Sequence, residues 1–268
     1  VAGCIAPITD NGIGIAATAP GCKVMAVRIG WQLPDGQGVV RMDFASAGML
    51  YAVANGARII NCSWGNTSFL SMAVQAVLSE GGLIFVSAGN DGLDDPDYLG
   101  LYNDSRVLAV AATNSDDGKA DFSNYGSWVE LSAPGVAIWT TAYNPNGNLH
   151  TYGSTQGTSF SSPIAAGAAA LIWSAFPDFD AFDVSQLIRD SCDNIDAENP
   201  AYAGELGAGR VNLLKALGDD VQEVPGEFSL LRDAMNQAAV GDTIKVLAST
   251  PLGATTMLGK GLKIFGGY

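Results

Sequence analysis

Histidine is almost absent from this sequence: His150 is the only one among 268 residues. Cysteine is scarce as well, and Cys4, Cys22, Cys62 and Cys192 match no metal-ligand spacing, so a Cys/His zinc site is not expected. No apolar run reaches the roughly 18–20 residues that a membrane-spanning helix needs. The longest candidate, residues 163–176, is rich in Ala and Gly and predicts a buried helix instead.

Positive charge is also in short supply. The chain has 13 basic against 27 acidic residues, a formal net charge of -14. Such a surface repels phosphate backbones, so nucleic acid is not an expected partner. The acidity is compatible with an exported protein that binds divalent cations, and equally with acidity that only maintains solubility. Charged residues make up 15% of the chain and hydrophobic residues 48%, which favours a large buried core over disorder.

The N-terminus carries no targeting signal that can be recognised. Val1 opens the chain without Met or a basic segment, and we expect the sequence to begin inside a longer protein. Cys62 lies in an apolar strand pattern, which predicts an inert core thiol. Cys4 and Cys22 are candidates for a disulfide if the protein is exported, but the sequence does not supply their distance.

Short β-branched segments alternate with longer Ala-rich segments along most of the chain. This pattern is typical of an α/β fold in which helices cover both faces of a parallel sheet. The strands are expected to be nearly continuously apolar because they are buried on both faces. The expected strands are Lys23–Ile29, Arg58–Ser63, Leu83–Ala88, Val107–Ala112 and Val129–Ser132, and the expected helices are Asp43–Asn55, Phe69–Ser79, Ser161–Phe176 and Ala181–Asp190.

The alternating strand and helix pattern of the sequence ends near residue 217. We expect a first domain over residues 1–217, a polar linker over 218–226 and the start of a second domain over 227–268. In the second domain, 228–239 predicts a short helix, and 242–247 and 262–265 predict strands. This part resembles the opening turns of a right-handed parallel β-helix. One coil cannot bury its face alone, so we expect the chain to continue past Tyr268.

The segment Gly157-Thr-Ser-Phe-Ser-Ser-Pro163 has the physical features of a nucleophile turn. Glycine lets the backbone approach a substrate closely, and the N-terminus of the following helix favours a developing negative charge. The alternative is a helix cap, in which Ser159 or Ser161 satisfies free N–H groups. The segment is not the Gly-x-Ser-x-Gly elbow of α/β-hydrolases, because Ser161 occupies the second glycine position.

The same segment closely resembles the nucleophile motif of the subtilisin-like serine proteases (subtilases, peptidase S8). Other segments resemble that family in order and approximate spacing: Val1-Ala-Gly, Ala19-Pro20, Ile59-Ile-Asn-Cys-Ser-Trp-Gly65, Phe85-Val-Ser-Ala-Gly-Asn-Asp-Gly92, Phe122-Ser-Asn-Tyr-Gly126 and Leu131-Ser-Ala-Pro-Gly-Val136. The resemblance covers about residues 1–217. It implies a three-layer αβα subtilisin-like parallel sheet that lacks its first strands, followed by the short β-helix-like piece.

The resemblance implies roles for several residues. Ser159 would attack the scissile carbonyl, and the Asn90 side chain would donate to the oxyanion together with the backbone N–H of Ser159. Without the neighbouring motifs, a plain turn residue would be the preferred interpretation of Asn90. A bound peptide would pair with backbone edges as an added strand. The implied substrate-binding residues are Ser63, Trp64 and Gly65 on one wall, Ala88 and Gly89 on the other, and the segment from Gly38 to Val40. Trp64 is equally compatible with a packing role.

The departures from the family concern the base. A serine nucleophile needs a base and an orienting carboxylate, and in the family both precede the segment that Val1 opens. His150, in a polar loop, is a poor substitute, and Asp91 and Asp121 match no triad position. We therefore expect an active parent protein, whereas residues 1–268 alone should be inert. The missing strands would leave unpaired edges at 23–29 and 58–63, so the isolated chain is expected to fold poorly.

The chemistry of the family requires no cofactor, but Thr9-Asp-Asn-Gly-Ile-Gly-Ile15 resembles its calcium-binding loop. Asn11 would bind calcium through its side chain, and Thr9, Ile13 and Ile15 through their carbonyls. A metal-free Gly-rich turn is the alternative.

The leading interpretation is a secreted, monomeric endopeptidase that forms an acyl-enzyme on extended peptide or protein substrates. The alternative is a catalytically dead scaffold of the same fold in a binding or adhesion protein. The upstream sequence distinguishes the two.

Overall fold

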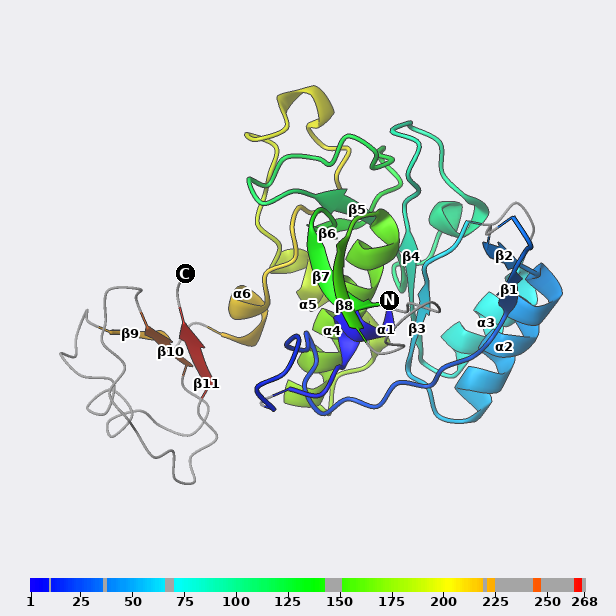
Figure 1. The fold of residues 1–268 in the computed structure, drawn as a ribbon, viewed down its shortest axis with the longest axis horizontal. Helices are drawn as coiled ribbons and strands as arrows, with labels where there is room; N and C mark the ends of the chain where they lie inside the picture. The colour runs from blue at the N-terminus through cyan, green and yellow to red at the C-terminus, as the bar shows by residue number, and fades with distance from the viewer. Residues whose placement is uncertain are drawn as a thin grey trace. The chain divides into compact units, whose positions relative to one another are not determined.

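The computed structural model describes residues 1–9, 11–35, 38–65, 70–142 and 151–218, together with three strands farther along, at 221–224, 243–246 and 263–266. The chain divides into two compact units, Val1–Ala216 and Leu217–Tyr268 (Figure 1).

A four-stranded parallel sheet forms the centre of the first unit. Its order is β3 (Ile59–Cys62), β4 (Leu83–Ser87), β5 (Val107–Thr113) and β6 (Leu131–Pro134). Every residue of β4 and β5 is buried, which explains why the sequence of these strands is continuously apolar. The α/β fold class and the four strands expected in this region are confirmed, with β6 beginning two residues later than predicted.

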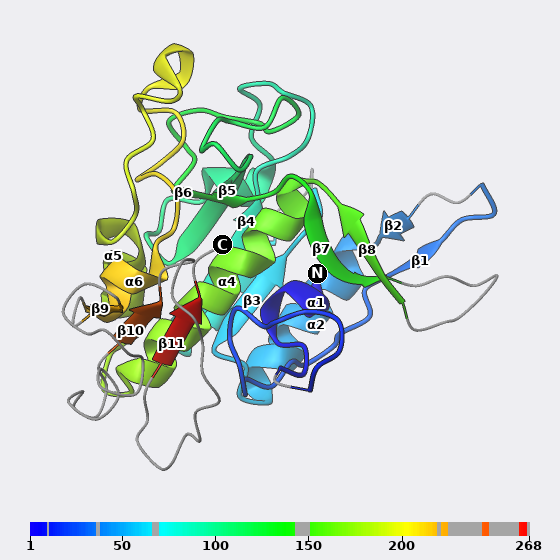
Figure 2. The same cartoon turned by 60° about the vertical axis from the view of Figure 1, so that its left-hand side comes forward.

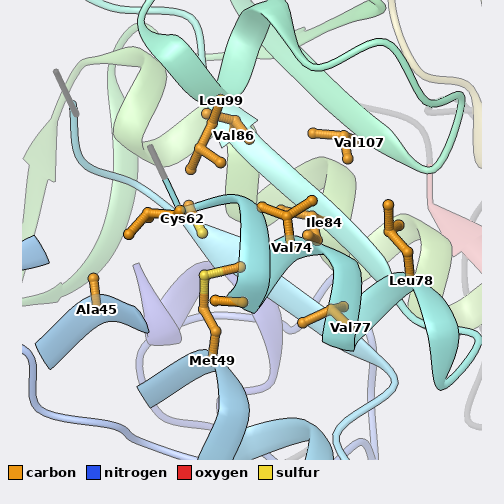
Figure 3. Packing of buried hydrophobic residues seen from close by; sticks show 12 residues of the cluster. Ala45, Met49, Cys62, Val74, Val77, Leu78, Ile84, Val86, Leu99 and Val107 are labelled. Atoms are coloured by element: carbon orange, nitrogen blue, oxygen red, sulfur yellow. The ribbon is translucent and has the colours of Figure 1, made fainter. Parts of the chain in front are cut away.

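Helices cover both faces of this sheet (Figures 1 and 2). One layer contains α2 (Met42–Ala54) and α3 (Ser71–Ser79), whose apolar faces join β4 in one cluster that includes Met49, Val74 and Ile84 (Figure 3). The other layer contains α4 (Thr158–Ala175) and α5 (Ala181–Asp190). A capping box starts α5: the Asp180 carboxylate accepts from the N–H of Asp183, whose carboxylate accepts from the N–H of Asp180.

Smaller elements complete the first unit. They are α1 (Ala2–Ile5), the antiparallel pair β1 (Gly30–Gln32) and β2 (Gly38–Val40), the 3-10 helices η1 (Tyr98–Leu101) and η2 (Pro200–Tyr202), the antiparallel pair β7 (Ile138–Ala142) and β8 (Thr151–Thr155), and α6 (Leu213–Leu217). All four cysteines are free, so Cys4 and Cys22 are not paired here. Among the described helices, none is both long and apolar enough to cross a membrane.

The strand predicted at Lys23–Ile29 is not formed. Only Gly30–Gln32, just beyond it, pairs with another strand. A strand needs a neighbour to bond with, and a groove of about 960 Å³ separates residues 23–29 from β3. The groove is largely apolar: Val27 and Ile29 line one side, and Ile60 and Cys62 of β3 line the other. Among the residues that the structure describes, the segment therefore has no strand beside it to pair with.

Cys62 is buried in this region, as expected for a core thiol. Its burial raises the pKa of the thiol to about 12, because the thiolate would lose its hydration. The thiolate is the reactive form of cysteine, so this side chain is chemically inert near neutral pH.

We expect residues 1–268, purified alone, to melt without a sharp cooperative transition. The β3 edge that faces the groove has no strand paired to it in the described part of the chain, and the groove leaves apolar surface open to water. Differential scanning calorimetry measures this directly. Equal calorimetric and van't Hoff enthalpies in a single transition would show that the unfilled groove is tolerated.

The second unit contains three described strands, β9 (Val221–Val224), β10 (Thr243–Val246) and β11 (Lys263–Gly266). They form a parallel sheet in the order β11-β10-β9, with Thr243 opposite both Val221 and Lys263. The two later strands match the predicted ones. Residues 221–224, which lie within the linker predicted over 218–226, pair with β10 as a strand. The helix predicted at 228–239 lies outside the described residues.

Candidate active site

The turn around Ser159 begins at Gly157, the residue that caps α4. Gly157 has a φ of +138°, a conformation that side chains of L-residues rarely adopt, and its N–H donates to the carbonyl of Gly135 at 2.9 Å. The helix starts at Thr158, earlier than the predicted Ser161, so half-buried Ser159 lies in its first turn. Backbone N–H groups in a first turn have no partner inside the helix and favour negative charge.

The helix-cap alternative for the serines is wrong. Gly157 occupies the cap position and has no side chain to cap the helix, and the first-turn N–H of Thr158 donates to the Asn90 Oδ1 instead of to a serine. The Ser161 hydroxyl is buried and makes no hydrogen bond with any group that the structure describes. A capping serine would instead accept a bond from a backbone N–H in the first turn.

Pro163 leaves a backbone carbonyl of the nucleophile turn free to bond with the segment that follows β3. Proline has no N–H to donate to the carbonyl four residues earlier, which is that of Ser159. The Ser63 hydroxyl donates to this carbonyl at 2.9 Å instead. Asn61 supports the contact, since its Nδ2 donates to the Ser63 oxygen at 2.8 Å while its Oδ1 accepts from the Ser162 hydroxyl at 2.8 Å. The sequence reasoning missed Asn61, although a polar residue inside an apolar strand was a usable signal.

The Asn90 side chain contacts Thr158, the residue that precedes Ser159 in the chain. Its Oδ1 accepts from the backbone N–H of Thr158 at 2.9 Å and from the Thr158 hydroxyl at 3.1 Å. The Thr158 hydroxyl is also within hydrogen-bond distance of the backbone N and O of Gly89, 3.2 Å in each case. These contacts orient the carboxamide with its Nδ2 on the side away from Thr158. Sequence reasoning did not single out Thr158, because its role depends on this contact between distant segments.

A buried asparagine holds the turn that carries Asn90. The Asn124 Oδ1 accepts from the N–H groups of Asp91 at 2.9 Å and Leu93 at 3.2 Å, and its Nδ2 donates to the carbonyl of Asp95 at 3.0 Å. Gly89 has a φ of +108°, and a Cβ there would lie 2.4 Å from the Asn124 Nδ2. The turn thus requires glycine at position 89 for both conformation and space. This arrangement explains the resemblance of residues 122–126 to the family.

The two predicted pocket walls follow neighbouring strands. Ser63, Trp64 and Gly65 come after β3, while Ala88 and Gly89 come after β4. The carboxyl ends of parallel strands share one edge of the sheet, where α/β proteins commonly bind ligands. Both walls touch the nucleophile turn, one through Ser63 and the other through Gly89. Trp64 is half-buried and packs against the core cluster, so its packing role is present in the fold.

The predicted third substrate segment lies in a separate two-stranded sheet. Gly38 pairs with Gln32 and Val40 pairs with Gly30, within β1 and β2. Val40 also packs against the core cluster between α2 and α3. The backbone of β2 is extended, as an edge for an added peptide strand requires.

The loop over residues 9–15 forms a compact turn, with Asp10 outside the described part. The Asn11 Oδ1 accepts from the N–H of Ile13 at 2.9 Å, and the Thr9 hydroxyl accepts from the N–H of Ala17 at 3.2 Å. Residues whose placement is described include no group of three or more His, Cys, Asp or Glu side chains arranged to hold a metal. Calcium binding here would depend on backbone carbonyls and the Asn11 amide, donors that suit this hard cation.

A catalytic base is not among the residues placed by the structure. His150, the only histidine of the sequence, lies outside the described ranges. Asp91 is exposed, and its backbone N–H is held by Asn124. The described arrangement thus contains a hydroxyl, an oriented amide and a helix N-terminus, which can together attack and polarise a carbonyl once a base takes the hydroxyl proton.

Comparison with known proteins agrees with this geometry. The profile of the subtilase family (Peptidase S8) matches residues 1–209. Thermitase from Thermoactinomyces vulgaris is 36% identical over 219 residues, which cover 81% of this chain and 72% of thermitase. The thermophilic serine proteinase of Bacillus sp. strain AK1 is also 36% identical, over 220 residues that make up 81% of this chain and 51% of that proteinase.

Solved structures show the same fold. A protease from Pseudoalteromonas arctica PAMC 21717 superposes with a TM-score of 0.70 at 29% identity, covering 80% of this chain and 68% of that one. Fervidolysin from Fervidobacterium pennivorans, a keratinolytic enzyme related to subtilisin, gives a TM-score of 0.68 at 31% identity, covering 81% of this chain and 35% of fervidolysin. The chain therefore belongs to the subtilase family, whose members are serine endopeptidases of the subtilisin type.

Proposed function

We propose that Ser159 is the nucleophile of a peptide-bond hydrolysis that proceeds through an acyl-enzyme. The observation that carries this proposal is the pair of hydrogen bonds from Thr158 to the Asn90 Oδ1. Thr158 directly precedes Ser159, so these bonds hold the Asn90 carboxamide beside the nucleophile turn. As the Ser159 Oγ bonds to the carbonyl carbon, the carbonyl oxygen gains negative charge. The Asn90 Nδ2 and the backbone N–H of Ser159 donate to that oxygen.

The rest of the site positions the peptide. Gly65 and Gly89 lie on opposite walls, and the residue before the cleaved bond would occupy the space between them. The extended edge of β2, with Gly38 and Val40, would pair with residues farther along the substrate. Relatives of this chain are proteases that act on peptide or protein substrates, so we propose extended polypeptide as the substrate class here.

The hydroxyl proton of Ser159 must go to a base during the attack. We propose that the active protein includes a histidine and an aspartate in addition to residues 1–268, and that these residues alone do not hydrolyse peptides. Hydrolysis of a chromogenic peptide by the active protein, with serine or alanine at position 159, tests the proposal. The same assay on residues 1–268 alone tests their inactivity, with the Ser159→Ala variant as background.

The hydrogen bonds around the Ser159 turn favour our proposal of a peptidase over the dead-scaffold alternative. Asn90, Thr158 and Ser63 are held against the Ser159 turn by specific hydrogen bonds, which a binding protein would not need.

We propose that the protein acts as a monomer. We also propose that it acts outside the cell, since one relative, from Xanthomonas campestris, is named an extracellular protease. The parallel strands β9, β10 and β11 support our proposal that the second unit begins a β-helix.

Subtilases need no cofactor for catalysis. We propose a structural calcium ion bound by the Asn11 side chain and the carbonyls of Thr9, Ile13 and Ile15. Millimolar calcium chloride is then expected to raise the Tm of the active protein by a few degrees, because it binds only the folded loop. The Asn11→Ala variant should lose this shift.

Asn194→Ala is the matched control for the calcium experiment, since the Asn194 Oδ1 likewise accepts a bond from a backbone N–H two residues on, at 3.0 Å. This variant should keep the calcium-dependent rise in Tm. An equal shift in the Asn11 and Asn194 variants would place calcium elsewhere, and no shift in the unmutated protein would remove the proposal.

A further inference from the structure

A carboxylate lies directly against one of the two pocket walls. If Gly65 carried a Cβ, that atom would lie 2.7 Å from the Asp97 Oδ2 and 3.4 Å from its Oδ1. Asp97 is 32 positions away in sequence, and the fold brings it to this point. Gly65 follows Ser63, which bonds to the Ser159 carbonyl, and two residues of extended chain span at most about 7 Å. The carboxylate therefore lies farther along the wall that begins at the nucleophile turn.

The position of Asp97 is fixed by a well-packed element. Asp97 is the residue that precedes η1, and the N–H of Gly100 donates to its carbonyl at 2.9 Å. Leu99 in the same turn is fully buried in the core cluster, against which Trp64 of the pocket wall also packs. A Cβ on Gly100 would lie 3.2 Å from the Trp128 ring, so the turn is closely packed on that side too. Half-buried Asp97 thus sits on a rigid support, as a specificity residue requires.

All charged side chains in the segment that contains Asp97 are negative. Residues 88–102 include four aspartates, Asp91, Asp94, Asp95 and Asp97, and contain no Lys or Arg. The Asp94 Oδ1 accepts from the Trp128 Nε1 at 2.8 Å. Asp97 is the aspartate whose carboxylate is seen against Gly65. A substrate side chain that reached Gly65 from between the walls would approach this carboxylate.

We propose that Asp97 selects substrates with a cationic side chain, Arg or Lys, at the residue that precedes the cleaved bond. The proposal rests on the proposed function, because that function places this substrate residue between the two walls. A long side chain can run along the wall from Ser159 and bring its charged end to the carboxylate. Arg can form two parallel charge-assisted bonds to it, and Lys a single point-charge contact. An acidic side chain at the same substrate position would be repelled.

The test compares two peptides that are identical except for Arg or norleucine before the cleaved bond. Binding is measured by fluorescence anisotropy with the active protein carrying Ser159→Ala, which cannot turn the peptides over. We expect the Arg peptide to bind at least tenfold more tightly. Adding Asp97→Asn should reduce this preference to about twofold or less, since Asn keeps the shape and removes the charge. Gly65→Ala should also lower it, because the new Cβ would displace the carboxylate.

The matched control is Asp95→Asn. Asp95 belongs to the same acidic loop, is exposed, and contributes only its backbone carbonyl to the Asn124 network. This variant should keep the Arg preference, which separates a specific contact from the general charge of the loop. The proposal would be overturned if the protein with Asp97 unchanged showed no preference for the Arg peptide. It would also be overturned if Asp95→Asn and Asp97→Asn reduced that preference equally. Hydrolysis is scored separately with Ser159 present. Failure of hydrolysis with the Arg preference intact refutes the proposed function and leaves the role of Asp97 supported.

Discussion

Replacing Ser159 with alanine is expected to lower kcat of the active protein on the order of 10⁶-fold, a magnitude measured for a related subtilisin whose nucleophile was removed. The physical reason is that the acyl-enzyme route needs an oxygen on this side chain, and alanine offers none. Peptide binding should be little changed, because the pocket walls and the β2 edge remain. The measurement is kcat on a chromogenic peptide, with Kd for the same peptide taken from anisotropy.

Ser161→Ala provides the matched control for this experiment. Ser161 lies in the same helical turn, and its buried hydroxyl makes no hydrogen bond to a described group. Its replacement should leave kcat unchanged. A Ser159→Ala protein that kept more than about one percent of the activity would show that another residue performs the attack, since the residual rate expected from the oxyanion groups alone is far lower.

Replacing Asn90 with alanine should lower kcat by about 10²–10³-fold with little change in KM. This magnitude is the one measured when the equivalent donor is removed from a related subtilisin, about 2.7–4 kcal/mol of barrier. The amide is needed most when negative charge has developed on the carbonyl oxygen, so its loss affects the transition state more than substrate binding. Because Thr158 holds the Oδ1 at 2.9 Å, the donor is preorganised before substrate arrives.

Asn114→Ala distinguishes this role from that of a turn residue. The Asn114 Oδ1 also accepts two backbone bonds, from Asp116 and Gly118 at 2.9 Å each, but in a separate turn. Its loss should cost stability without lowering kcat. If Asn90→Ala behaved like Asn114→Ala, or raised KM with kcat unchanged, Asn90 would not be an oxyanion donor.

The parts of the fold that sequence predicts well are those whose partners are among the described residues. Strands β4 and β5 are buried on both faces, so their apolar sequences identify them without other information. Residues 23–29 are also mostly apolar apart from Lys23 and Arg28, yet they form no strand, since pairing depends on a neighbouring strand that no local pattern reveals. Likewise α4 begins earlier than predicted because the positive φ of Gly157 sets its start.

The candidate site divides in the same way. Motif resemblance identified Ser159 and Asn90, and the structure brings their segments together. Motif resemblance does not single out Thr158, Asn61 or Asp97, because the roles proposed for them depend on contacts between segments that are far apart in sequence. Asp97 is the clearest case: in sequence it is one aspartate among four, and only its position beside Gly65 distinguishes it.

The convergence of positions 159 and 90 on one carbonyl oxygen can be observed directly in a crystal structure of the active protein after reaction with a peptidyl phosphonate. We expect phosphorus bonded to the serine oxygen and the phosphoryl oxygen about 3 Å from both the asparagine Nδ2 and the serine backbone nitrogen. A phosphoryl oxygen that points away from the asparagine, or an adduct on a different side chain, would contradict the account.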